Sequence, residues 1–477
     1  MNLFRSEYIR NISKVSIGVL IAQSLSILLS PIITRLYSPS EFGVFSLYVS
    51  IVLVIEVCAC LRYEMTIVLA EDEEKASRLF WLSSLIMSLI SILVAIVVLC
   101  LFVISRYQIL SFSFWNEIYI LMPLSVFAIS AVNILTLWCT RKKYFSLLAF
   151  IQAGLVIINN ILSILAGLYI SGKGEYLIYS QLSSYVIIAL IAGIIVANKD
   201  KGLFKNLSIR RFRELFLEYK RMALYNTPAS VVNIFSQRLP AYTFPRAYGL
   251  TSVGYYDLVY RILKLPSQVV GNAIRNVFFQ KASEDYKTYG TFAEPLSNNV
   301  KALVRLSILP FCLIGAFSTW LFPFIFGSEW VDSGWYVIAL LPWLATSFIV
   351  VPISSAVSIT SQDNKFFKLQ VYCLIVRIIV IVLGAKLFAN PVYTVACFSF
   401  VGCFFQMMIL RLIAVSTGSG IYKLFGGDIA LYIVVSVLVS SGIFLLVYYR
   451  LFVPAIIISL VAIGLYLLYL KKSFIKK

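Results

Sequence analysis

The chain has 477 residues, of which 61% are hydrophobic and only 13% are charged. Soluble domains average about half apolar and a quarter charged residues, so this composition excludes a water-soluble fold. There is no histidine, which removes the commonest metal ligand and the usual acid or base at neutral pH, and we expect no cofactor and no metal.

Apolar stretches separated by charged, glycine and proline residues divide the chain into fourteen predicted transmembrane helices. They cover residues 13–34, 42–64, 79–104, 117–139, 146–170, 176–197, 222–245, 253–279, 300–326, 334–360, 366–388, 391–414, 428–448 and 452–470. We therefore predict an all-α polytopic membrane protein. It has an N-terminal six-helix lobe (1–197), a basic cytoplasmic linker (198–221), a second six-helix lobe (222–415) and two additional helices (428–470).

The loops predict the orientation. Those on the side of the N-terminus hold 27 basic residues and those on the other side hold six. Basic loops stay in the cytoplasm, so both termini are predicted to be cytoplasmic. The net charge of +19 is then a signal of topology, and nucleic acid is not an expected partner.

Two outer turns carry similar residues at a constant offset of 211. The first turn begins at Arg35 and continues through Tyr37 to Gly43, and the second begins at Arg246 and continues through Tyr248 to Gly254. Six helices separate the turns, and this even number gives the two lobes the same orientation, as in a parallel repeat. Chance and a common turn chemistry are the alternative explanations.

The seven basic residues that are not counted with the loops fall within the predicted spans, where a charged side chain costs at least about 2.5–3.5 kcal/mol. They are Arg62, Arg238, Arg261, Lys264, Arg275, Arg305 and Arg377. In the helix over 253–279, a polar stripe about 27 Å long contains Asp257, Arg261, Lys264, Gln268 and Arg275, and Pro266 can bend this helix.

Snorkelling to the bilayer surface suits Arg62 and Arg305 but not residues near mid-membrane depth. We therefore predict that Arg261, Lys264 and Arg377, with Arg238 and Arg275, line a cationic cavity for an anionic ligand.

Two acidic residues are candidates for ion coupling. Glu56 lies deep in the helix over 42–64, and Asp257 is four residues from Arg261 and can pair with it. A structural hydrogen bond to a neighbouring helix is the alternative for Glu56. The acidic run from Glu71 to Glu74 is predicted to be a solvated loop.

No phosphate-binding GxxxxGK[ST] motif or hydrolase motif is present. The longest outer loop, residues 105–116, is too short to hold the donor and acceptor of a glycan polymerase or ligase. The helix bundle itself is the expected site, and the protein is not expected to be an enzyme.

Three stretches resemble the Wzx-type O-antigen flippases of the multidrug/oligosaccharidyl-lipid/polysaccharide (MOP) exporter superfamily. They are Asn11–Lys14, Pro31–Gly43 and Leu61–Met65 with the acidic loop that follows. The resemblance is sharpest over residues 1–80 and extends more loosely to about residue 415.

This resemblance implies a flippase of the bacterial inner membrane. It would move undecaprenyl-pyrophosphate-linked oligosaccharide, an O-antigen or capsule repeat unit, to the outer leaflet by alternating access. The implied partners are this lipid-linked substrate, membrane lipid, a polysaccharide polymerase and a chain-length regulator. Arginine offers a diphosphate permanently charged, bidentate donors. A cation-coupled drug or metabolite exporter of the same superfamily is the alternative, although it predicts acidic cavity residues.

Overall fold

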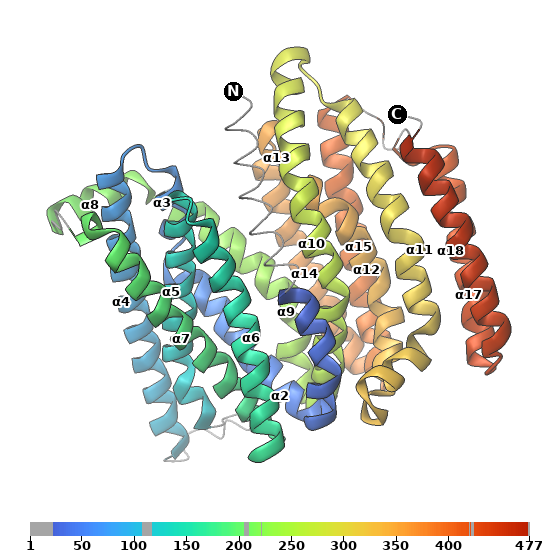
Figure 1. The fold of residues 1–477 in the computed structure, drawn as a ribbon, viewed down its shortest axis with the longest axis horizontal. Coiled ribbons are helices and arrows are strands. Elements are labelled where there is room, and N and C mark those ends of the chain that lie inside the picture. The colour runs from blue at the N-terminus through green and yellow to red at the C-terminus, as the bar shows by residue number, and fades with distance from the viewer. Residues whose placement is uncertain are drawn as a thin grey trace. The chain divides into compact units, whose positions relative to one another are not determined.

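The computed structural model describes residues 22–106, 117–204, 209–220, 222–418, 420 and 424–475. They form helices and connecting turns (Figure 1). The chain divides into two compact units, unit 1 (Met1–Arg238) and unit 2 (Leu239–Lys477).

In unit 1, residues 22–36 are helical. The helices that follow are α2 (Pro39–Ala59), η1 (Tyr63–Met65), α3 (Thr66–Leu69), α4 (Glu73–Arg106), η2 (Glu117–Leu121), α5 (Met122–Arg141), α6 (Phe145–Tyr169), α7 (Gly174–Lys199), η3 (Lys201–Phe204), α8 (Ile209–Glu218) and the π-helix η4 (Met222–Asn226). Helix α9 (Thr227–Ala247) begins in unit 1 and ends in unit 2.

Unit 2 continues with α10 (Leu250–Tyr289), α11 (Ala293–Phe326), η5 (Ser328–Trp330), α12 (Ser333–Ile353), α13 (Ala356–Ile359), α14 (Asp363–Leu387), α15 (Pro391–Ser416), α17 (Asp428–Tyr448) and α18 (Phe452–Ile475). Pro266 lies inside α10, which nevertheless continues as one helix of 40 residues.

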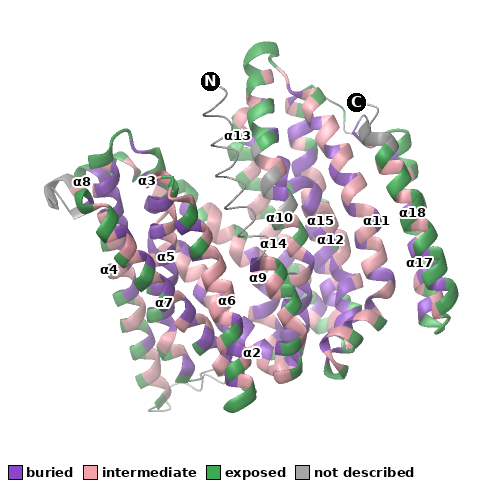
Figure 2. Ribbon diagram, in the orientation of Figure 1, coloured by how far each residue is buried: buried purple, intermediate pink, exposed green. Residues whose placement is uncertain are grey.

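Each predicted transmembrane segment corresponds to a helix, although the first begins outside the described residues. Among the described residues, eleven helices are long and apolar enough to cross a membrane. This confirms the prediction of a polytopic membrane protein. The surface agrees, since exposed apolar residues recur along α18 and along α4 from Leu85 onward (Figure 2).

Several contacts between equivalent helices recur in the two units, although α2 also contacts α7 and α5 also contacts α6 in unit 1. In unit 1, α5 contacts α2, α4 and α7, and α6 contacts α7. In unit 2, α12 contacts α10, α11 and α15, and α14 contacts α15. Counted along the predicted spans of each lobe, α5 and α12 are the fourth helices. Their partners are in both cases the second, third and sixth helices of the same lobe, and the fifth helix contacts the sixth. The packing therefore supports the predicted repeat.

The tyrosine of the repeated turn makes the same kind of contact in both units. The hydroxyl of Tyr37 donates to the Ser163 carbonyl of α6 at 2.8 Å. The hydroxyl of Tyr248 lies 3.0 Å from the Gly384 carbonyl of α14, the equivalent helix. A tyrosine after the first helix of each block thus binds the backbone of the fifth.

The turns before these fifth helices also agree. Lys143 precedes α6 with φ 57°, and Ser361 precedes α14 with φ 53°. Both are left-handed conformations that non-glycine residues rarely adopt. A shared turn geometry at equivalent places is further support for a repeat.

The end of unit 1 that carries the turn between α3 and α4, the turn between α5 and α6, and α8 is called here the basic end. Its acidic loop is ion-paired with neighbouring basic side chains, although the loop was predicted only to be solvated. Glu73 pairs with Lys142, Glu74 with Arg78, and Glu71 lies 3.9 Å from Lys75.

Candidate functional site

The predicted polar stripe forms on α10 of unit 2. Asp257 Oδ2 and Arg261 Nη2 lie 2.7 Å apart, which is the pairing that their spacing predicts. The Asp257 side chain is only 3% exposed, whereas the Arg261 side chain is 47% exposed. Asp257 therefore anchors one side of a guanidinium whose remainder reaches the surface of the unit.

Lys264 lies one turn further along α10, where it contacts an aromatic side chain. Its ammonium donates to the Tyr260 hydroxyl at 2.6 Å and lies 4.8 Å from the centre of the same ring. Such cation–π contacts favour a fixed cation in a partly desolvated place. The contact holds the half-buried Lys264 close to Arg261 along the helix.

Aromatic rings from three helices continue inward from Tyr260. Tyr260 stacks on Tyr256 of the same helix at 5.9 Å and on Trp343 of α12 at 5.6 Å. Phe398 of α15 forms T-shaped pairs with Tyr256 and Trp343, with ring centres 6.4 and 5.4 Å apart. Offset and edge-on pairs are the favoured arrangements of aromatic rings.

Arg377 of α14 completes this group. Its guanidinium carbon is 4.2 Å from the centre of the Trp343 ring and 4.2 Å from that of Phe398. The residue is 3% exposed. We call Tyr256, Tyr260, Lys264, Trp343, Arg377 and Phe398 the cation–aromatic cluster.

A glycine on α15 makes room for this arginine. A Cβ added to Gly402 would clash with Nη2 of Arg377 and lie 2.6 Å from Cδ1 of Trp343. Because the Trp343 side chain is itself buried, neither group can move without disturbing the ring stack.

The structure thus brings four predicted site residues into one region of unit 2. Asp257, Arg261 and Lys264 are neighbours on α10, and Arg377 connects to Lys264 through the rings of Trp343 and Tyr260. Arg377 is enclosed by aromatic rings, whereas the prediction placed it at a cavity wall.

The other predicted residues lie elsewhere. Arg275 is half-buried on α10, about 21 Å along the helix from Arg261. Arg238 is half-buried on α9 and is the last residue of unit 1. Arg35 and Arg246 are exposed at the ends of their helices.

In unit 1, Glu56 binds a neighbouring helix. The amide of Asn133 on α5 donates to Glu56 Oε1 at 2.6 Å. This is the inter-helix hydrogen bond that was the alternative explanation for Glu56. Two turns away on the same two helices, Tyr48 and Ser125 share a hydrogen bond of 2.7 Å.

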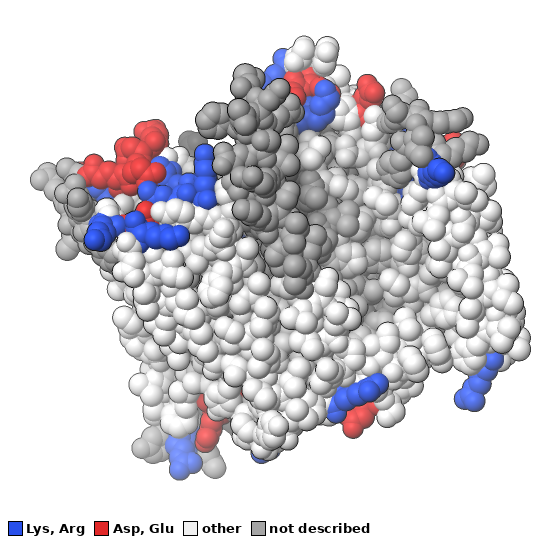
Figure 3. Space-filling view, in the orientation of Figure 1, with Lys and Arg blue, Asp and Glu red and all other residues white. Residues whose placement is uncertain are grey.

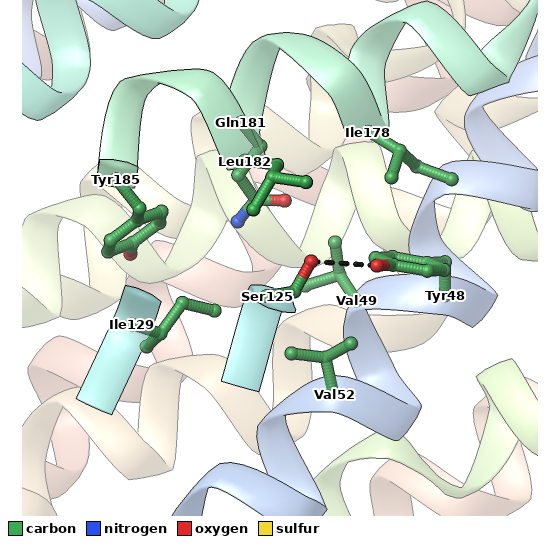
Figure 4. A pocket seen from close by; sticks show the side chains of 9 residues that line it. All are labelled: Tyr48, Val49, Val52, Ser125, Ile129, Ile178, Gln181, Leu182 and Tyr185. Atoms are coloured by element: carbon green, nitrogen blue, oxygen red, sulfur yellow. Dashed lines mark hydrogen bonds between the residues drawn. The ribbon is translucent and has the colours of Figure 1, made fainter. Parts of the chain in front are cut away.

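A small pocket lies beside the Tyr48–Ser125 pair (Figure 4). Gln181 and Tyr185 of α7 face it, together with apolar residues of α2 and α5. It leaves about 10 Å³ of free space, which suits one water molecule. This pocket is too small for a sugar or a diphosphate.

The aromatic members of the cluster were not predicted from the sequence. Tyr256 and Tyr260 share a face of α10 with Lys264 because they are spaced four residues apart, and this spacing could have identified them. Trp343 and Phe398 lie on other helices, so no local pattern connects them to Arg377.

The described helices and candidate spans define a polytopic membrane protein. The chain is similar to a structure of the lipid II flippase MurJ in an inward closed conformation. The TM-score is 0.68 at 16% identity, covering 96% of this chain and 100% of that chain. It is also similar to an inward-facing multidrug resistance MATE family transporter of the MOP superfamily, with a TM-score of 0.64 at 13% identity, covering 84% and 98%. An outward-facing MATE family transporter gives 0.58 at 13% identity, covering 86% and 95%.

Sequence comparison gives the family. The model of the polysaccharide biosynthesis protein family matches residues 8–279, more than half of the chain. The chain therefore belongs to the polysaccharide biosynthesis protein family. No curated protein matches it.

Proposed function

We propose that this protein is a flippase that moves undecaprenyl-pyrophosphate-linked oligosaccharide across the bacterial inner membrane, with both termini in the cytoplasm. The substrate would be an O-antigen or capsule repeat unit, and the two units would alternate its access to the two leaflets. Family membership and the transporter fold support this proposal.

The observation that carries the proposal is the pair of neighbouring cations on α10. Helix α10 corresponds to the predicted span over 253–279, although it is not among the eleven described helices that are apolar enough by themselves to cross a membrane. A charged side chain at membrane depth is costly unless it meets a partner or water. Arg261 is exposed and Lys264 is half-buried, so both are accessible to a ligand in a way that Arg377 is not. A diphosphate is a compact dianion that such a pair would hold through charge-assisted hydrogen bonds.

The Asp257–Arg261 ion pair suggests how binding can be reversed. In the absence of substrate, Asp257 neutralises Arg261, and an arriving phosphate would compete with this carboxylate. Release would restore the ion pair, which limits the free energy of binding and keeps turnover possible. Asp257 stays a candidate for ion coupling because protonation would remove its hold on Arg261.

Arg377 would act as a positioning residue in this scheme. It holds Trp343 and Phe398 together, and Trp343 supports the Tyr260 ring that contacts Lys264. Removal of the Arg377 side chain would let the Lys264 ammonium move, although it would delete no contact with the substrate.

Substitution in the host cell tests the proposal. We expect Arg261→Ala to reduce surface polysaccharide and to leave lipid-linked repeat units on the cytoplasmic side, at constant protein level. Arg106→Ala, which removes an exposed arginine at the end of α4, is the matched control. Wild-type amounts of surface polysaccharide in the Arg261→Ala strain would argue against a cationic pathway.

A further inference from the structure

Helix α8 lies outside the candidate membrane spans and is fixed to the basic end of unit 1. The Tyr63 hydroxyl donates to the Phe216 carbonyl at 2.7 Å, and the two rings stack at 5.2 Å. Lys75 Nζ donates to Glu218 Oε1 at 2.7 Å. Leu215 is buried between these contacts, so one face of α8 is held against the unit.

The opposite face of α8 combines cations with an apolar side chain. Arg213, Leu217 and Lys220 are spaced by four and three residues, which places them on one side of a helix. All three are exposed, and Leu217 is 54% exposed. In the π-helix that follows, Leu224 and Tyr225 are also exposed. Apolar side chains flanked by cations are typical of helices that lie in the membrane surface.

The charges at this end do not balance. The acids Glu71, Glu73, Glu74 and Glu218 are matched by basic partners within the protein. Two described acids at this end, Asp72 and Glu214, have no ion pair. Among the described residues, five exposed cations at this end form no ion pair: Lys143, Lys199, Lys201, Arg213 and Lys220.

The visible surface of this end carries both basic and acidic side chains (Figure 3). Charged side chains of unit 1 gather at the basic end, and the surface between the two ends of the unit is nearly free of charge (Figure 3). A band of uncharged surface suits the interior of a bilayer, and the cations without an ion pair at the basic end suit its anionic headgroups.

We propose that α8 is a membrane-surface anchor that binds anionic phospholipid headgroups of the adjacent leaflet. Leu217 would enter the region of the acyl chains, while Arg213 and Lys220 bind the phosphates on either side. This anchor is distinct from the proposed substrate site on α10 and does not depend on it. It would hold the connection between the two units at a constant depth in the membrane.

The test uses the full-length protein in nanodiscs of phosphatidylcholine, with and without phosphatidylglycerol. We expect hydrogen exchange over residues 209–220 to slow when phosphatidylglycerol is present. In native mass spectrometry, the double variant Arg213→Gln/Lys220→Gln should bind phosphatidylglycerol about 25-fold more weakly, from about 1 kcal/mol per cation.

Arg106→Gln/Lys173→Gln is the matched control, because both residues are exposed at the opposite end of unit 1. We expect it to retain the wild-type affinity for phosphatidylglycerol. Equal exchange rates in the two kinds of nanodisc would overturn the proposal. So would an equal loss of lipid binding in the double variant and its control.

Discussion

The enclosed position of Arg377 makes a quantitative prediction about Gly402. In Gly402→Ala, the new Cβ would clash with the Arg377 guanidinium and lie 2.6 Å from Trp343 Cδ1. Overpacking of this kind costs about 1–3 kcal/mol. Weakening two cation–π contacts adds about 1–2 kcal/mol, and the better helix propensity of alanine returns about 1 kcal/mol. We expect a net loss of about 1–4 kcal/mol in the free energy of unfolding.

Gly442→Ala provides the control, because a Cβ at this position on α17 meets no atom within 4 Å. The assay is unfolding of the purified protein in detergent, followed by tryptophan fluorescence. Gly402→Ala should unfold at a lower temperature than wild type, and Gly442→Ala should not. The cost of Gly402→Ala should also shrink in an Arg377→Ala background, since part of the clash is then absent. Equal stability of the two glycine variants would refute the seating of Arg377 between Trp343 and Phe398.

Three further predictions follow from single contacts. Asp257→Asn should bind a soluble diphosphate-bearing ligand more tightly and release it more slowly, because no carboxylate competes for Arg261; unchanged affinity and off-rate would count against the exchange. Tyr248→Phe should lower the free energy of unfolding by about 1–3 kcal/mol, since the Gly384 and Thr394 partners lose a hydrogen bond, and a calorimetric scan that matches wild type would contradict this. Burial raises the pKa of the Glu64 carboxyl, although Arg62 opposes the shift. At pH values above the folded-state pKa, the ionised Glu64 therefore lowers the free energy of unfolding. Glu64→Gln should therefore melt at a higher temperature than wild type at pH 8, with a difference that shrinks as the pH falls through that pKa; a difference independent of pH would exclude this cause.

The membrane helices could be predicted because the apolar pattern of each one lies within its own stretch of sequence. A transmembrane helix requires a continuous apolar stretch, and eleven of the described helices contain one. Helix α8 was not predicted, because its apolar positions Phe212, Leu215 and Tyr219 lie within the basic linker and become significant only when they pack on α4.

The site was predictable only where its residues share a helix. The Asp257–Arg261 pair follows from a spacing of four residues, and the structure contains it. The partners of Glu56 and Arg377 come from helices distant in sequence, Asn133 for the first and Trp343 and Phe398 for the second. No periodicity in a single sequence indicates which face of one helix will meet which face of another.

The central claim is that cations on α10 receive the diphosphate of a lipid-linked oligosaccharide. The most direct measurement is transfer of a fluorescent undecaprenyl-diphosphate oligosaccharide between the leaflets of proteoliposomes, with a membrane-impermeant quencher that reports the exposed fraction. We predict transfer by the wild-type protein and by the Lys173→Gln control, and loss of most of it in Arg261→Gln/Lys264→Gln. Absence of transfer by the wild-type protein, or an unchanged rate in the double variant, would contradict the claim.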